Sequence, residues 1–133
     1  SVEGGFFVNI HESAEDYLER VLMIRQRKGV VYSIDIVHEL NFSKPSVSVA
    51  MKRLRENGYI QMDADGAITL LPPGEEIAQH IYARHQLLSE FLTQLGVSPE
   101  TAAADACKIE HDISEESYKR IKEVTLQKRT GLG

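Results

Sequence analysis

The chain has 133 residues, a net charge of −5 and a single cysteine. This length suits one domain, or two small domains that share a core. One cysteine excludes an internal disulfide, so we expect an intracellular, cytoplasmic protein. No apolar run reaches the roughly 18 residues that a membrane-spanning helix needs. Residues 1–10 lack the basic and apolar regions of a signal peptide, and we interpret them as a poorly ordered arm or a non-native remnant.

The charge is unevenly distributed along the chain. Residues 1–19 contain five acids and no Lys or Arg, whereas residues 20–60 contain eight Lys and Arg against three acids. Residues 61–133 contain seven Lys and Arg against twelve acids. The acidic total argues mildly against nucleic-acid binding. The basic middle segment is the more informative feature, because a local cluster of one sign attracts a partner of the other.

The first half of the chain is typical of three helices followed by a hairpin. Three segments have apolar residues at helical spacing, and they are 12–28, 34–40 and 44–57. Ser33 and Ser43 can cap the second and third helices, and Gly58 ends the third. Two short apolar segments then flank Asp65-Gly66, which predicts a two-stranded hairpin within 59–71.

The second half is expected to be helical. Pro72-Pro73-Gly74 predicts a break in the chain, and the helical segments that follow are 75–95, 98–109 and 114–127. The predicted fold class is therefore mainly α. It has an N-terminal winged helix-turn-helix of three helices and a β-hairpin in residues 1–72, followed by a helical domain in residues 73–133.

This order of elements is typical of DNA-binding domains, in which the third helix enters the major groove. The side chains expected to face the bases are Ser43, Lys44, Pro45, Ser46, Ser48 and Val49. The cations within reach of phosphates are Lys28, Lys52, Arg53 and Arg55. The alternative is a small helical domain whose Lys and Arg form a solvated face. The element order favours DNA binding.

Three potential metal ligands lie on one helical stripe near the C-terminus. Cys107, Glu110 and His111 occupy positions i, i+3 and i+4. A thiolate, a carboxylate and an imidazole suit a divalent transition metal better than calcium. Further candidate ligands on other helices are Asp16, Glu19 and His85.

Each of these residues also has a structural interpretation. Cys107 could be a small buried hydrophobe, and Asp16 and Glu19 could be first-turn acids favoured by the helix dipole. His85 could be a surface residue. A nucleophilic Cys107–His111 pair lacks evident oxyanion donors and an orienting third group, so we do not expect an enzyme.

Four stretches resemble one known family. They are AEDYLE (14–19), SKPSVSVAMKRL (43–54) with GYI (58–60), RHQLLSEFL (84–92) and ACKIEHDIS (106–114). Over residues 12–126 the chain resembles the diphtheria toxin repressor family of metal-dependent transcriptional repressors, especially its short manganese-transport-regulator branch. The resemblance implies a winged helix followed by a helical dimerisation and metal-binding domain. It also implies a homodimer that binds operator DNA of metal-uptake genes when Fe(II) or Mn(II) is bound, with Zn(II), Co(II) or Ni(II) as possible substitutes in vitro.

The resemblance assigns individual ligands. Asp16 matches a metal position that is Asp in manganese-type members and Met in iron-type members, and Glu19 and His85 match ligands of an adjacent position. Glu110 and His111 match a pair that both branches share. Cys107 matches a position that is Cys in the iron-type branch and Glu in the manganese-type branch. The sequence is thus a hybrid, which leaves the metal and the number of ions open. We expect no SH3-like domain, such as longer members carry, after Gly133.

Overall fold

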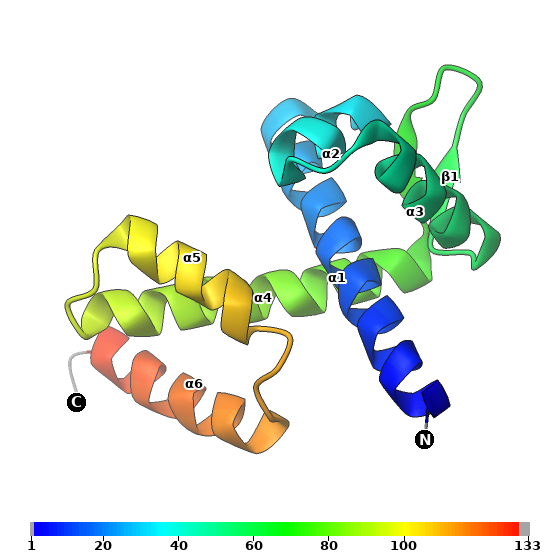
Figure 1. Ribbon diagram of the computed structural model, residues 1–133. Helices are drawn as coiled ribbons and strands as arrows, with labels where there is room; N and C mark the ends of the chain where they lie inside the picture. The colour runs from blue at the N-terminus through cyan, green and yellow to red at the C-terminus, as the bar shows by residue number, and fades with distance from the viewer. Residues whose placement is uncertain (1, 131–133) are drawn as a thin grey trace. The chain divides into compact units, whose positions relative to one another are not determined.

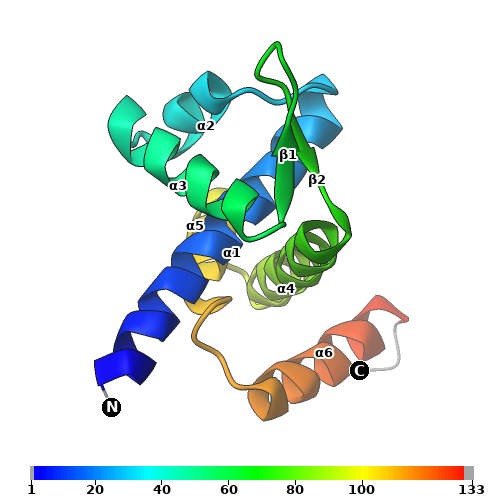
Figure 2. The ribbon, with the colours of Figure 1, turned by 90° about the vertical axis from the view of Figure 1, so that its right-hand side faces the viewer.

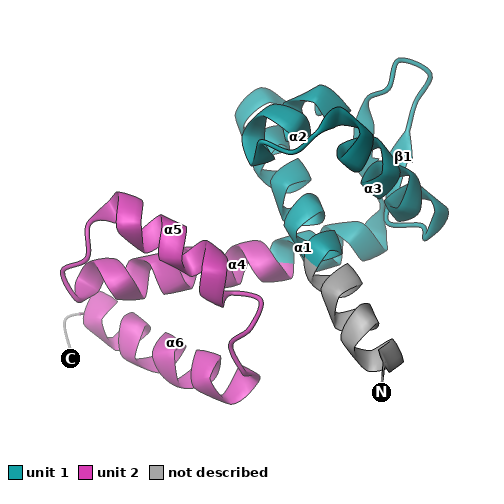
Figure 3. Cartoon of the chain, viewed as in Figure 1, with its two compact units in different colours: residues 1–79 teal, residues 80–133 magenta. Residues whose placement is uncertain are grey.

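A computed structural model describes the backbone of residues 2–130 and the side chains of residues 13–130. The expected arm at residues 1–10 therefore lies outside the part described in full. The chain forms two compact units, residues 1–79 and residues 80–133 (Figure 3). None of the described helices is both long and apolar enough to cross a membrane.

The first unit begins with three helices, α1 (Val2–Lys28), α2 (Ser33–Leu40) and α3 (Lys44–Glu56) (Figure 1). Their apolar stripes face one another, as the helical spacing predicts. The side chains that are fully buried in this unit include Leu18, Leu22, Ile24, Ile36, Val47 and Met51. The predicted winged helix-turn-helix order is therefore confirmed, with α1 beginning earlier than the predicted residue 12.

The turn between α2 and α3 positions the start of α3. Asn41 ends α2 in the left-handed conformation, with φ of 55°, which Asn tolerates better than most residues. The hydroxyl of Ser43 then accepts a hydrogen bond from the backbone N–H of Ser46 at 3.2 Å, as predicted for a helix cap. The predicted cap at Ser33 is wrong. Tyr32 is the capping residue, and its N–H donates to the carboxylate of Asp35 at 2.9 Å.

The predicted hairpin is confirmed. Strands β1 (Ile60–Met62) and β2 (Ile68–Leu70) lie side by side (Figure 2). They pair antiparallel, with Ile60 opposite Leu70. One carboxylate oxygen of Asp63 accepts hydrogen bonds from the N–H groups of Asp65 and Ala67 at 2.9 and 3.0 Å, which closes the loop. Gly66 has φ of 87°, a conformation that glycine adopts without strain.

Helix α4 (Pro72–Gln94) begins within the predicted break. Pro72 and Pro73 occupy its first turn, where a missing N–H costs little because that group has no partner inside the helix. A Cβ atom at Gly74 would lie 2.1 Å from the carbonyl oxygen of Tyr59. Glycine is therefore required for close packing of this turn against the hairpin, and the Pro-Pro-Gly segment starts a helix instead of ending one.

The second unit contains the rest of α4 together with α5 (Pro99–Ile109) and α6 (Glu115–Arg129). Ser98 and Ser114 cap α5 and α6, and each hydroxyl accepts from an N–H three residues later. The apolar core of this unit consists of Leu87, Leu88, Ala106 and Tyr118, with Ile113 and Ile121 packed against it.

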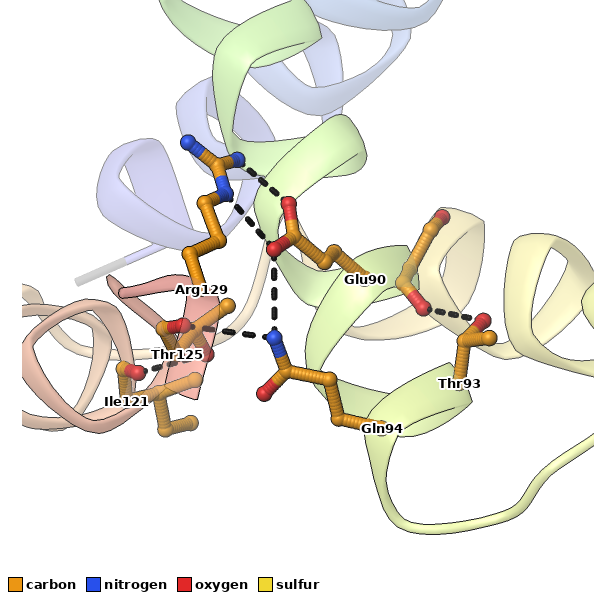
Figure 4. A network of polar contacts seen from close by, with 7 residues as sticks. Glu90, Thr93, Gln94, Ile121, Thr125 and Arg129 are labelled. Atoms are coloured by element: carbon orange, nitrogen blue, oxygen red, sulfur yellow. Dashed lines mark hydrogen bonds and ion pairs between the residues drawn. The ribbon is translucent and has the colours of Figure 1, made fainter. Parts of the chain in front are cut away.

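A polar network joins the C-terminal ends of α4 and α6 (Figure 4). The guanidinium of Arg129 binds both carboxylate oxygens of Glu90, with its Nε at 2.6 Å from Oε2. The amide of Gln94 donates to the carbonyl of Thr125 at 3.2 Å. Thr125 is fully buried, and its hydroxyl donates to the carbonyl of Ile121 at 2.8 Å. These contacts fix α6 along α4.

Candidate metal centre

Three predicted metal ligands meet within the second unit. His85 comes from α4, Cys107 from α5, and Glu110 caps the C-terminus of α5. Nδ1 of His85 lies 2.9 Å from Oε2 of Glu110 and 3.7 Å from Sγ of Cys107. One ligand atom from each residue lies within 4.8 Å of the other two. The i, i+3 spacing puts Cys107 and Glu110 on one face of the helix, and α4 supplies the histidine opposite them.

The burial of Glu110 makes this cluster a good fit for a cation. Glu110 is 0% exposed. Its second oxygen, Oε1, lies 3.4 Å from Nε2 of His111 and accepts no hydrogen bond within residues 13–130. A carboxylate removed from water is costly unless it is paired with a charge or a donor. A divalent ion at this position would satisfy the oxygen.

His111 extends the cluster from the turn that follows α5. Its side chain is only 3% exposed, and it lies next to the buried carboxylate of Glu110. The second unit therefore brings together four of the six predicted ligands. Glu110 and His111 stand at the end of α5, but their side chains are withdrawn from solvent.

The electrostatics of the cluster favour a protonated His85 in the metal-free protein. The hydrogen bond with Cys107, and next the hydrogen bond with Glu110, raise the pKa of His85 to about 10, while burial opposes the increase. Binding a metal requires a neutral imidazole and a thiolate. A metal ion that bound here would therefore have to displace the proton of His85.

The donor set indicates the class of metal. Sulfur and imidazole ligands suit transition metals such as iron, cobalt, nickel and zinc, and carboxylates suit manganese as well. Calcium and magnesium prefer all-oxygen sites. The chemistry of Cys107 and His85 is consequently a poor match for those two ions.

The two remaining predicted ligands, Asp16 and Glu19, lie on α1 in the first unit. They are three residues apart and share a face of the helix. Glu19 is only 2% exposed, and Asp16 is half-buried. Both lie well inside α1, which begins at Val2, so their interpretation as first-turn acids favoured by the helix dipole is wrong.

The predicted DNA-contacting residues are exposed on the surface of the first unit. Val47 and Met51 of α3 point into the core, which leaves the opposite face of the helix in solvent. The exposed residues are Ser43, Lys44, Pro45, Ser46, Ser48, Val49, Lys52, Arg53, Arg55 and Lys28. Val49 is 52% exposed, and an exposed apolar residue here is available to a thymine methyl group.

The cations of this surface differ in whether they already form ion pairs with acidic side chains. Lys28 forms an ion pair with Asp35 at 2.5 Å, and the ammonium of Lys52 lies 3.9 Å from Glu56. Arg53 forms no side-chain ion pair with another residue in the described part of the chain. Arg53 can thus bind a phosphate without first breaking an ion pair.

Two family profiles match almost the whole chain. Residues 9–68 match the N-terminal DNA binding domain of the iron dependent repressors. Residues 72–128 match the metal binding and dimerisation domain of the same proteins. The His85, Cys107 and Glu110 cluster lies in the second matched region, and α3 lies in the first.

Similar proteins and structures agree with these profiles. The transcriptional regulator MntR of Salmonella typhimurium is 39% identical over 106 residues, which cover 80% of this chain and 68% of that protein. The structure of T. acidophilum IdeR aligns with a TM-score of 0.75 at 26% identity, over 88% of this chain and 53% of the other. A manganese-dependent transcriptional repressor in complex with manganese also aligns with a TM-score of 0.75, at 25% identity, over 90% of this chain and 53% of the other. The chain spans about half the length of these two structures.

Proposed function

The chain belongs to the iron-dependent repressor family, and from this premise we propose that it is a transcriptional repressor whose binding to operator DNA requires a divalent metal ion. The observation that carries the proposal is the cluster of His85, Cys107 and Glu110, in which Glu110 is fully buried and the other two are half-buried. An ordinary helical core has no need of a carboxylate, an imidazole and a thiol within 4.8 Å of one another. The same chain carries an exposed helix-turn-helix.

The proposal assigns a separate function to each of the two parts of the chain. Residues 1–72 bind DNA, and residues 73–133 bind metal and form a homodimer. In the DNA-binding part, α3 enters the major groove with Ser46, Ser48 and Val49 near base edges. None of these side chains makes the bidentate base contacts of Arg or Asn. Sequence selection therefore depends in part on DNA shape.

The proposed ligands are the side chains of six residues: Asp16, Glu19, His85, Cys107, Glu110 and His111. The hydrogen-bonded cluster in the second unit supports the assignment of His85, Cys107 and Glu110. Glu19 is assigned because it is a buried carboxylate on α1, and carboxylates are ligands that suit manganese. The activating metal is Fe(II) or Mn(II), and Zn(II), Co(II) and Ni(II) can replace it in vitro. The regulated genes are those of metal uptake and homeostasis.

The proposed activation follows from the charges of these residues. A bound divalent ion would supply positive charge that offsets the negative charge of the proposed carboxylate ligands. Without that ion, the acidic ligands on α1 would have no metal to hold this helix in place. Helix α1 shares the core of the first unit with α3, so fixing α1 fixes the two α3 helices of a dimer. A metal ion that binds more tightly to the DNA-competent conformation shifts the conformational equilibrium toward it. The coupling free energy between two such sites is typically about 1–3 kcal/mol.

Metal-dependent DNA binding is the decisive test. DNA duplexes would be selected from a random pool with the purified protein and Mn(II), and their affinity would then be measured by gel shift with Mn(II), with Fe(II) under anaerobic conditions, and with chelator. We expect binding with either metal and none with chelator. Equal affinity in chelator would contradict the proposal.

The alternative is a metal-independent winged helix that binds DNA or protein. It would show DNA binding without metal, and calorimetric titration with Mn(II) would give no heat of binding. The matched metal-binding domain and the ligand cluster favour the first proposal.

A further inference from the structure

Arg84 is a buried arginine next to the ligand His85. Only 9% of the residue is exposed. A buried guanidinium is costly unless several partners compensate it, and this one has partners on two other elements of the second unit. Arg84 begins the RHQLLSEFL stretch (84–92), in which only His85 is a proposed metal ligand.

The first partners of Arg84 are the carbonyls of the turn that carries two ligands. Its Nη1 donates to the carbonyl oxygens of Glu110 and Ile113, each at 3.2 Å. The last carbonyls of a helix have no partner inside it and need an external donor. Arg84 supplies that donor at the end of α5, and it thereby holds the backbone on both sides of His111.

The other partners lie on α6. Nη2 of Arg84 forms an ion pair with Glu115 at 2.6 Å, and the guanidinium lies 4.8 Å from the centre of the Tyr118 ring. The planar guanidinium of arginine can donate hydrogen bonds to carbonyls from one edge and to a carboxylate from another, while its face stacks on an aromatic ring. Lysine has no such planar group. The contacts orient the guanidinium from three directions.

We propose that Arg84 is a positioning residue for metal binding, which holds the turn with Glu110 and His111 in its ligand-presenting conformation. This inference rests on the proposed function. One helix then sets both sides of the site, because α4 presents His85 directly and fixes the opposing turn through the neighbouring Arg84. Its contacts with Glu115 and Tyr118 also make the docking of α6 a determinant of ligand geometry.

A purely structural role for Arg84 makes a different prediction, and the chain offers a matched control. Arg129 also joins α4 to α6, through its paired contacts with Glu90 (Figure 4). It does not contact the turn at residues 110–114. If Arg84 acts only by attaching α6 to α4, Arg129→Met and Arg84→Met will have similar effects on metal binding. If it positions the turn, only Arg84→Met will weaken metal binding.

The experiment compares the full-length wild type with Arg84→Met, Arg84→Lys, Glu115→Gln and Arg129→Met. Circular dichroism and sedimentation check fold and assembly. Mn(II) affinity is measured by calorimetry, and anaerobic Co(II) titration records the ligand-field bands and the sulfur-to-cobalt band of Cys107. Residues that only orient metal ligands typically contribute about 10-fold to 100-fold in affinity. We expect a loss of that size and altered Co(II) bands for Arg84→Met, a partial loss for Arg84→Lys, and no change for Arg129→Met.

Glu115→Gln keeps the experiment decisive if Arg84→Met does not fold, because the side chain of Glu115 is 64% exposed and its replacement leaves the core intact. Removing this ion pair loosens Arg84, so we expect weaker Mn(II) binding and shifted Co(II) bands here too. If Arg84→Met folds, wild-type affinity and an unchanged Co(II) spectrum in this variant would overturn the inference. If Arg84→Met does not fold, the same result in Glu115→Gln would overturn it. Equal losses in Arg84→Met and Arg129→Met would also overturn it. A wild-type protein that binds no metal would contradict the proposed function itself.

Discussion

Nδ1 of His85, on α4, lies 2.9 Å from Oε2 of Glu110, at the end of α5. The contact pairs an imidazole with a fully buried carboxylate from a distant part of the sequence. Because Glu110 also lies beside Cys107 and His111, it is the central member of the cluster.

Glu110→Gln should therefore abolish metal activation while the fold survives. The amide has the same size as the carboxylate, so packing is retained, but the charge that attracts a cation is lost. We expect the loss of Mn(II) affinity to exceed the roughly 10-fold to 100-fold effect of residues that merely orient ligands. Calorimetry measures the affinity, and gel shift measures activation. His111→Ala should have the same effect on activation, and unchanged activation in both variants would remove this cluster from the mechanism.

Metal affinity should increase with pH. The hydrogen bonds with Cys107 and Glu110 raise the pKa of His85, so in the metal-free protein the imidazole is protonated at neutral pH and metal must displace that proton. Calorimetry between about pH 6 and about pH 8, in buffers of different ionisation enthalpy, should detect proton release and tighter binding at the higher pH. Equal affinity across this range, without proton release, would contradict the prediction.

The same raised pKa has the opposite effect on the metal-free fold. The folded-state pKa of His85 lies above its unfolded value of 6.5, at about 10. The pairing therefore contributes its full stability below the unfolded pKa, and that contribution is lost as pH rises through the folded pKa. In chelator, urea unfolding should show that His85→Gln reduces the free energy of unfolding more at acidic than at alkaline pH. A loss that does not vary with pH would show that the ion pair makes no contribution.

Arg53→Ala should weaken DNA binding without changing metal affinity. Arg53 is exposed on α3, far in sequence from the cluster at residues 107–111. A phosphate contact adds about one unit to the slope of affinity against salt concentration, so its loss should reduce that slope by about 1. Lys119→Ala, an exposed charge removal on α6, is the matched control and should change neither property. An effect of Arg53→Ala on Mn(II) affinity would contradict the division of roles.

Local signals predicted much of this fold. The cap at Ser43 and the hairpin depend on residues close in sequence, and both are confirmed. The central residues of the turn are Ala64 and Asp65, one position earlier than the predicted Asp65-Gly66. The start of α4 was missed because Pro72 and Pro73 both break and begin helices. The close packing of Gly74 against Tyr59 accompanies the second outcome, and this contact cannot be read from the local sequence.

The site was predictable in part for the same reason. The spacing of Cys107 and Glu110 places them on one face of α5, and no tertiary information is needed for that. His85 was a candidate ligand by residue type, and the family resemblance placed it with the other ligands, since 22 positions separate it from Cys107. The burial of Arg84 could not be predicted, because it depends on carbonyls in the turn after α5 and on a carboxylate of α6. From the sequence alone, a buried charged residue next to a ligand cannot be distinguished from an exposed surface residue.

Cys107 should set the metal preference of the protein. A thiolate favours softer ions such as Zn(II), Co(II) and Fe(II), whereas a carboxylate suits Mn(II) and can bridge two ions. Cys107→Glu should therefore shift the ratio of Mn(II) to Co(II) affinity toward manganese by at least about tenfold, which corresponds to about 1.4 kcal/mol. Cys107→Ser separates loss of sulfur from gain of a carboxylate, and both variants should lose the sulfur-to-cobalt absorption band. Calorimetric competition gives the ratio, and the same titrations give the number of ions bound. An unchanged ratio in Cys107→Glu, with the band still present in Cys107→Ser, would show that the sulfur does not bind the metal.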